Sequence, residues 1–275
     1  VITGFQGINT DFRITTLERG GSDTSAILCD KFFKADKCII FTDVKGIYTT
    51  DQNLTKSAKK IEKISYEEML EMASLGAKVM QPASIQEARL NRIEIDVKST
   101  FSKKDGTIIT KKRNIHHKKT IRGISFTKND AKLTLVGVKD KPGVAASIFK
   151  PLYENSINVD MVVQNISPIG KETDLTFTVK LEDLSKTRKL VEKNKSIKFK
   201  KLIINRNVSK VSIVGVGMIT TPGVTFRMFK ALAKRKINIE VISTSEIKIS
   251  VLINKKNLKK SVEILHQEFK LSTSL

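Results

Sequence analysis

Tryptophan is absent from this chain of 275 residues, and only 3 tyrosines, 5 prolines and 2 cysteines occur in it. The two cysteines, Cys29 and Cys38, have no metal-binding spacing and no further cysteines with which to build a disulfide framework. Cys29 falls in a helix-like run and Cys38 in an apolar strand-like run. We therefore interpret both as buried free thiols, which fits a reducing cytoplasm.

Long apolar segments are also missing. The sequence has no run of 18 or more apolar residues, so it predicts no membrane-spanning helix. Its first residues do not have the pattern of a signal peptide. We expect a cytoplasmic protein, with enough residues for two or three domains.

Acidic residues are few relative to basic ones. The chain has 50 Lys and Arg against 28 Asp and Glu, a net charge of +22. The basic clusters, such as 111–113 and 198–201, fall in separate regions with no aromatic platform between them. We interpret this charge as a lysine-rich solvated surface and expect no nucleic acid and no membrane as partners, because basic charge alone indicates only non-specific attraction.

The most informative segment present is 16–26, which joins a strand-like run to a helix-like run. Gly20 and Gly21 allow close approach of the backbone to a ligand, and Ser22 or Asp23 can cap the helix that follows. Arg19, beside these amides, suits a carboxylate or phosphate. An ordinary capped turn with a surface arginine explains the same residues.

The second half of the chain contains a repeat. The Pro-Gly turn at Gly143 recurs at Gly223, an offset of 80 residues, and the Ile-Asn pair at Asn158 recurs at Asn238 with the same offset. Each copy reads as strand, Pro-Gly turn, amphipathic helix, Ile-Asn turn and strand. The pattern indicates a duplicated small α/β module. In the first half, Ser65 with Glu68 predicts a capping box and a helix start.

Together these features resemble the aspartate kinase family, the aspartokinases, which phosphorylate the side-chain carboxylate of aspartate. The residues that carry the resemblance are Gly4-Phe5-Gln6-Gly7, Arg19 to Asp23, Thr42-Asp43-Val44, Gly46 to Thr49, Tyr66 to Met69, Ala73 to Lys78, Gln164-Asn165 and Ser243 to Ile247.

The resemblance implies an α/β fold: the C-terminal part of an amino-acid kinase three-layer α/β sandwich with a mostly parallel sheet, followed by two ferredoxin-like ACT (α+β) domains. We expect residues 1–110 in the kinase domain, 111–120 in a linker, 121–205 in the first ACT domain and 206–275 in the second. These limits are approximate, because paired ACT domains of the family can share strands.

The resemblance also implies the catalytic residues. Arg19 would grip a substrate carboxylate, Ser22 would donate a hydrogen bond to the substrate, and Asp23 would orient a lysine upstream or the substrate ammonium. On the residues alone, Asp23 can equally be a helix cap. The residues implied to contact ATP are Thr42, Asp43, Tyr48 and Lys78.

Some of these ATP contacts have plain alternatives. Tyr48 can be a half-buried loop aromatic, and Lys78 a surface lysine. Phosphoryl transfer from ATP requires Mg²⁺. Because the sequence shows no dedicated carboxylate cluster, we expect the nucleotide and water to hold most of that ion, and we assign no metal ligands.

In the duplicated region the resemblance implies a site for regulatory amino acids, where the Pro-Gly turns open helices whose free amides receive an effector carboxylate. The implied effector-binding residues are Asp140, Gly143, Ala145, Asn158, Gln164, Val224, Thr225, Asn238, Ile239, Ser245 and Glu246. Taken singly, Asn158 and Asn238 can simply form turns.

The implied function is ATP-dependent phosphorylation of L-aspartate to 4-phospho-L-aspartate, the first step of lysine, threonine and methionine biosynthesis. Lysine or threonine, or both, would regulate it through the ACT domains, which we also expect to form a homo-oligomer. In the family, a glycine-rich motif with a phosphate-binding lysine lies upstream of the position matching Val1, so we expect this chain to lack the N-terminal part of the active site.

The alternative function is that of a non-catalytic regulatory subunit that binds amino acids. A pure regulator would not need the Arg19 loop or the Thr42-Asp43 pair.

Overall fold

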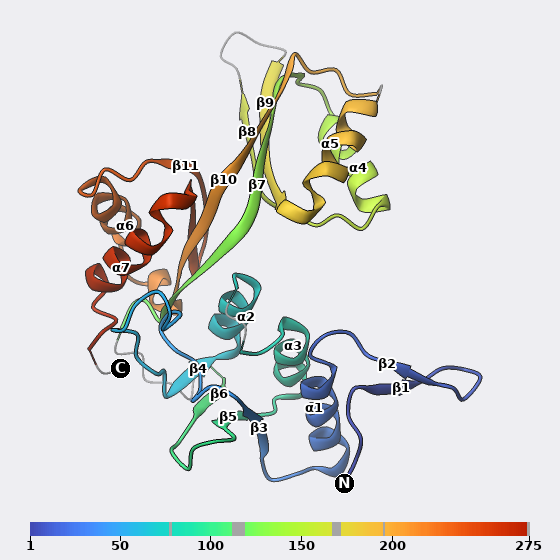
Figure 1. Ribbon diagram of the computed structural model, residues 1–275, viewed down its shortest axis with the longest axis vertical. Helices are drawn as coiled ribbons and strands as arrows, with labels where there is room; N and C mark the ends of the chain where they lie inside the picture. Colours follow the sequence, from blue (N-terminus) through green and yellow to red (C-terminus); the bar gives the residue numbers. More distant parts are fainter. Residues whose placement is uncertain (77–78, 112–118, 167–171, 195, 274–275) are drawn as a thin grey trace.

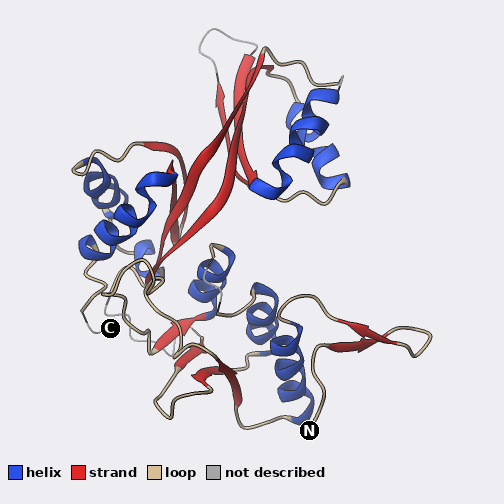
Figure 2. Cartoon of the chain, in the orientation of Figure 1, coloured by secondary structure: helices blue, strands red, loops and turns tan. Residues whose placement is uncertain are grey.

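The structure is a computed structural model that describes residues 1–76, 79–111, 119–166, 172–194 and 196–273. It has two halves, an N-terminal α/β half and a C-terminal half built on one long sheet (Figure 1). Figure 2 shows short strands under helices in the first half, and long strands flanked by two helix pairs in the second. Within the described ranges, every helix is too short or too polar to cross a lipid bilayer.

The N-terminal half begins with a β-hairpin and continues as a four-stranded mixed sheet with helices. Its elements are β1 (Gln6–Ile8), β2 (Ile14–Thr16), α1 (Gly21–Phe33), β3 (Cys38–Thr42), β4 (Lys63–Ser65), α2 (Tyr66–Ser74), α3 (Pro82–Asn91), β5 (Ile95–Ser99) and β6 (Thr107–Thr110). The sheet order is β3-β5-β6-β4, with β3 parallel to β5, β4 parallel to β6, and β5 antiparallel to β6. The expected α/β fold is confirmed, and of the three strand pairs described in this sheet two are parallel, where the resemblance implies a mostly parallel sheet.

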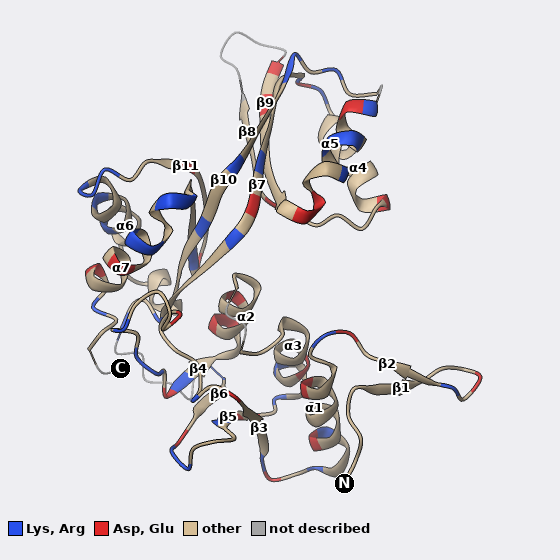
Figure 3. Cartoon of the chain, in the orientation of Figure 1, with Lys and Arg blue, Asp and Glu red and all other residues tan. Residues whose placement is uncertain are grey.

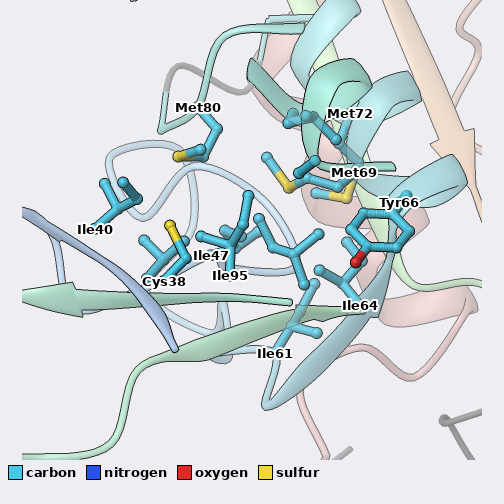
Figure 4. Close-up of a cluster of buried hydrophobic side chains, with 14 of the residues drawn as sticks. Cys38, Ile40, Ile47, Ile61, Ile64, Tyr66, Met69, Met72, Met80 and Ile95 are labelled. Carbon is cyan, nitrogen blue, oxygen red and sulfur yellow. The ribbon is translucent and has the colours of Figure 1, made fainter. Parts of the chain in front are cut away.

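The core of this half lies between the sheet and the three helices (Figure 4). Strand β3 alternates, so that Cys38 and Ile40 are buried while Ile39 and Phe41 are exposed. Burial, together with the nearby carboxylates Asp30 and Asp23, raises the pKa of the Cys38 thiol to about 11. The prediction of a buried free thiol is confirmed for Cys38.

Two local predictions can be compared with the structure directly. Cys29 is free as expected, but it is only half-buried on α1. Ser65 caps α2 as predicted: its hydroxyl accepts from the Glu68 N–H at 3.2 Å, and the Glu68 carboxylate accepts from the Ser65 N–H at 3.3 Å.

The C-terminal half is a six-stranded sheet with two pairs of helices. Its elements are β7 (Gly123–Lys139), α4 (Val144–Glu154), β8 (Val159–Ile166), β9 (Glu172–Lys180), α5 (Leu184–Lys193), β10 (Lys201–Val214), α6 (Val224–Ala233), β11 (Ile239–Ser245), β12 (Lys248–Asn254) and α7 (Leu258–Glu268), with 3₁₀ turns η2 (Leu181–Asp183), η3 (Val216–Ile219) and η4 (Lys255–Asn257). The strand order is β11-β12-β10-β7-β9-β8.

Strands β7 and β10 run through both ACT-like units (Figure 1). One end of the pair, where 130–139 of β7 joins β9, lies under α4 and α5. At the other end, 208–214 of β10 joins β12, and the start of β7 adds the fourth strand beside α6 and α7. The second unit therefore takes one strand from residues that precede the first unit in the sequence.

The two halves meet through a buried carboxylate. Glu68 is 1% exposed, and its Oε1 accepts from the Val216 N–H at 3.0 Å, at the start of η3. Its Oε2 lies 3.8 Å from Nε of Arg122, which is 5% exposed. Val214, the last residue of β10, packs into the core of the N-terminal half. The sheet of the C-terminal half is thereby anchored on helix α2.

Lys and Arg are distributed over both halves (Figure 3). Several contact acidic partners, among them Lys132 with Glu240 at 2.5 Å and Lys248 with Glu71 at 2.9 Å. The second pair joins β12 to α2 across the junction of the halves.

Candidate active and effector sites

The Arg19 loop turns tightly into helix α1. Gly20 is the N-cap residue with φ 86°, and no side chain caps the helix. A Cβ added at Gly20 would lie 2.2 Å from Cγ of Gln81, so the loop needs glycine for its conformation and for its packing on the start of α3. The prediction that Ser22 or Asp23 caps the helix is wrong, because the helix begins at Gly21 with Gly20 as its N-cap, which puts both residues inside the first turn.

The proposed catalytic side chains surround this uncapped helix start. Arg19 and Ser22 are exposed, while Asp23 is half-buried. Burial raises the pKa of the Asp23 carboxyl above its usual 3.8. An uncapped first turn leaves amides and a positive dipole end available to an anion, with a guanidinium beside them.

Thr42 and Asp43 lie where strand β3 ends. The Thr42 hydroxyl donates to Asp43 Oδ1 at 3.1 Å, and the Thr42 carbonyl accepts from the Thr100 N–H at 2.9 Å. Helix α1 and strand β3 are joined by four residues and pack together, so they run in opposite directions. Their lengths, near 20 and 16 Å at about 1.5 and 3.3 Å per residue, then bring the start of α1 to the end of the sheet where β3 ends. The Arg19 loop and the Thr42-Asp43 pair thus lie toward the same end of the sheet.

The segment after β3 carries the third of the ATP candidates. Tyr48 is half-buried and forms a β-bridge with Lys60. Lys78 lies outside the described residues.

The two Pro-Gly turns have the same geometry. Gly143 and Gly223 are the N-cap residues of α4 and α6, with φ 86° and 84°. At either glycine an added Cβ would meet nothing within 4 Å, and neither helix has a side-chain cap. Both turns are therefore open on the side of the missing Cβ, although in α4 the Val144 N–H already donates to the Lys141 carbonyl at 3.2 Å.

In the second unit, the helix start opens on a cavity of about 470 Å³. Val224 and Thr225 from α6 line it together with Ser245 and Glu246 at the end of β11. In the first unit, Gln164 and Asp140 are in contact, and Gln164 Nε2 donates to Asp140 Oδ1 at 3.5 Å. Ala145 is half-buried in the first turn of α4.

The Ile-Asn residues lie at the other ends of these helices. Asn158 and Asn238 are exposed and follow Ile157 and Ile237, whose N–H groups close each helix on the carbonyl five residues earlier. Asn238 lines a separate, polar cavity of about 280 Å³, and Ile239 beside it is half-buried. Within one chain, the structure does not bring these residues together with the Pro-Gly turns.

One buried group was missed by the sequence reasoning. His266 on α7 is fully buried at the junction of the halves, and its ring contacts the side chains of Thr49 and Ser57. The signal for its burial is present in the sequence, because His266 falls on the apolar face defined by Leu258, Val262 and Phe269. Its contact with residues more than two hundred positions away has no sequence signal.

Known protein families match both halves. The amino acid kinase family matches residues 1–99, and the ACT domain matches residues 133–194 and 211–269. The protein is therefore an amino acid kinase region joined to a pair of ACT domains.

Two relatives cover nearly the whole chain. An aspartate kinase of Pseudomonas putida is 45% identical over 273 residues, 98% of this chain and 66% of that protein. An aspartokinase of Bacillus sp. strain MGA3 is 41% identical over 275 residues, all of this chain and 67% of that protein. The chain thus spans about two thirds of the length of the curated relatives it matches. It belongs to the aspartokinase family.

Solved structures agree with this assignment. The aspartate kinase of Clostridium acetobutylicum superposes with a TM-score of 0.86 at 26% identity, over 97% of this chain and 62% of that one. Aspartokinase III of Escherichia coli, in complex with aspartate and ADP, gives a TM-score of 0.79 at 28% identity, over 97% and 60%. The same enzyme in complex with lysine and aspartate gives 0.77 at 28%, over 97% and 59%.

The burial of His266 generates a prediction about pH. Burial, and secondarily Lys119, lowers the pKa of His266 below its ordinary 6.5. Below pH 6.5 the unfolded chain therefore binds a proton more readily than the folded one, so stability is complete above that pH and declines as the pH falls, by at most about 1.4 kcal/mol per unit. The free energy of unfolding, measured in urea at a series of pH values, should fall more steeply below pH 6.5 for the wild type than for His266→Gln. Parallel profiles would contradict the burial of a neutral imidazole.

Proposed function

We propose that this protein is an aspartate kinase, which transfers the γ-phosphoryl group of ATP to the side-chain carboxylate of L-aspartate and gives 4-phospho-L-aspartate. The observation that carries the proposal is that α1 packs on β3, so that the Arg19 loop before α1 would lie toward the end of β3, where Thr42 and Asp43 are. An anion site next to a strand end suits a reaction between two anionic substrates. The E. coli relative bound to aspartate and ADP supports the choice of substrates.

The acceptor carboxylate is already ionised, so this reaction requires alignment and charge stabilisation more than a base. Arg19 would hold a carboxylate of aspartate, Ser22 would donate a hydrogen bond to the substrate, and the half-buried Asp23 would orient its ammonium group. Thr42, Asp43, Tyr48 and Lys78 would contact ATP. Its Mg²⁺ would be held by phosphate oxygens and water, since the described residues include no group of three or more metal-binding side chains.

The ACT pair would bind lysine or threonine and adjust this activity, as feedback on the first step of the pathway to those amino acids. Support comes from the open helix starts at Gly143 and Gly223, from the cavity that ends at Glu246, and from the lysine complex of the E. coli relative. Strands β8 and β11 are the two edges of the six-stranded sheet, and an edge strand can pair with a second chain, which favours a homo-oligomer. We place the protein in the cytoplasm, where Cys29 and Cys38 stay reduced.

Arg19→Ala tests the substrate assignment in the intact protein. Loss of a charge-assisted contact to bound carboxylate should raise the KM for aspartate by roughly ten- to a hundredfold, from about 1.5–3 kcal/mol, and leave the KM for ATP within about twofold. Arg13→Ala, at another exposed arginine in the preceding hairpin, should leave both constants unchanged. An unchanged KM for aspartate would show that Arg19 does not bind this substrate. A wild type that forms no aspartyl phosphate from ATP would refute the kinase proposal.

Thermal unfolding tests the effector assignment. At about 100 times its dissociation constant, lysine or threonine should stabilise the protein by about 2.7 kcal/mol, a shift in Tm of roughly 5–10 °C. Asp140→Ala should reduce the shift if the first unit binds the ligand, and Glu246→Ala if the second does. Glu182→Ala removes an exposed carboxylate elsewhere in the first unit and should preserve it. If neither amino acid moves the Tm of the wild type, alone or with the other, the ACT pair does not bind these effectors.

A further inference from the structure

His266 belongs to the C-terminal half, the ACT pair, yet both of its ring nitrogens contact the N-terminal half, the kinase region. Its Nε2 lies 2.8 Å from Thr49 Oγ1, and its Nδ1 lies 3.3 Å from Ser57 Oγ. Both partners lie in the segment that follows β3, residues 43–59, which we call the nucleotide loop because it contains Asp43 and Tyr48. The ring has no exposed surface.

Thr49 is fixed at all of its polar atoms. Its N–H donates to the Lys59 carbonyl at 2.8 Å, and its hydroxyl oxygen accepts from the Lys59 N–H at 3.0 Å. Its carbonyl accepts from the N–H of Ile124, in β7, at 2.7 Å, and its hydroxyl meets His266. Two contacts thus come from the loop itself and two from the C-terminal half. Because Thr49 follows Tyr48 directly, a shift of Thr49 moves the backbone that carries the Tyr48 ring.

The chemistry of the ring suits this position. A neutral imidazole has one donor and one acceptor, and the two hydroxyls that it meets can each take the complementary role. Burial and the charge of Lys119 both lower the pKa of His266, which favours the neutral ring. Ser57 in turn shares a hydrogen bond of 2.8 Å with Thr55, so the ring joins two points of the loop eight residues apart.

We propose that His266 is a positioning residue for ATP: it holds Thr49, and thereby sets the position of Tyr48 against the nucleoside. Helix α7 of the second ACT unit then contributes to nucleotide affinity indirectly, through Thr49 and Tyr48, without touching the nucleotide. The inference rests on the proposed kinase function, because it takes Tyr48 as a nucleotide contact. It adds a residue and a direction of control that the proposed function does not contain.

The test compares His266→Ala with His266→Gln, whose amide keeps a donor and an acceptor. His266→Ala should raise both the KM for ATP and the dissociation constant of a non-hydrolysable ATP analogue by about tenfold, which corresponds to about 1.4 kcal/mol. The KM for aspartate should stay within twofold, and His266→Gln should recover most of the nucleotide affinity.

Thr49 supplies an independent measurement, should His266→Ala fail to fold. Thr49→Val removes the hydroxyl and should raise the KM for ATP as His266→Ala does, whereas Thr49→Ser keeps the hydroxyl and should behave as wild type. The double variant should lose clearly less nucleotide affinity than the sum of the two single variants, because both changes remove the His266–Thr49 contact, while His266→Ala also removes the Ser57 contact and Thr49→Val the Lys59 contact.

Three outcomes would overturn the inference. These are unchanged nucleotide affinity in His266→Ala or Thr49→Val, additive effects in the double variant, and equal rises in the KM for ATP and for aspartate, which would indicate a structural role only. Failure of the kinase proposal looks different, because the wild type would then neither bind the ATP analogue nor form aspartyl phosphate.

Discussion

The Glu68 carboxylate is shared between two parts of the molecule that are far apart in the sequence. It closes the capping box of α2, accepts the Val216 N–H, and lies against the buried Arg122 guanidinium. Burial lowers the pKa of Arg122, and the charge of Glu68 opposes that shift. A buried pair of this kind contributes little net stability relative to apolar residues, but removal of one partner leaves a buried charge uncompensated. The relative position of the two halves therefore depends on it.

From this junction, two routes lead to the proposed sites. Val216 begins η3, and Met218, Ile219 and residues 221–225 then line the cavity proposed for an effector. On the other side, Ile124 and His266 hold Thr49 in the nucleotide loop. Because β7 and β10 also run into the first ACT unit, a ligand bound at either Pro-Gly turn would lie in a unit whose strands end at the N-terminal half. Coupling by such a route requires that the strands shift as one piece, which close-packed sheets allow.

Local signals in the sequence predicted local features. Ser65 and Glu68 predicted the start of α2, and the repeated Pro-Gly turns predicted two helix starts, because caps and turns depend on residues a few positions apart. The N-cap of α1 was mispredicted because the packing of Gly20 on Gln81 comes from another helix. The shared strand β7 and the burial of His266 against Thr49 are contacts between distant segments, which no periodicity reveals. The catalytic and effector residues were predicted from the resemblance and stay predictions, and the fold separates Asn158 and Asn238 from the Pro-Gly turns.

The claim on which this account depends most is that Glu68 makes the two halves one cooperative unit, and scanning calorimetry of Glu68→Ala tests it. The wild type should unfold in one transition. Glu68→Ala should lose about 3–5 kcal/mol and separate the transition into two, one for each half. Glu67→Ala is the control. Glu67 precedes Glu68 on α2, and its half-exposed carboxylate lies 3.7 Å from Arg89 on α3, so its removal should cost at most about 1 kcal/mol and keep one transition. A single transition in Glu68→Ala, with stability within about 1 kcal/mol of the wild type, would contradict the account.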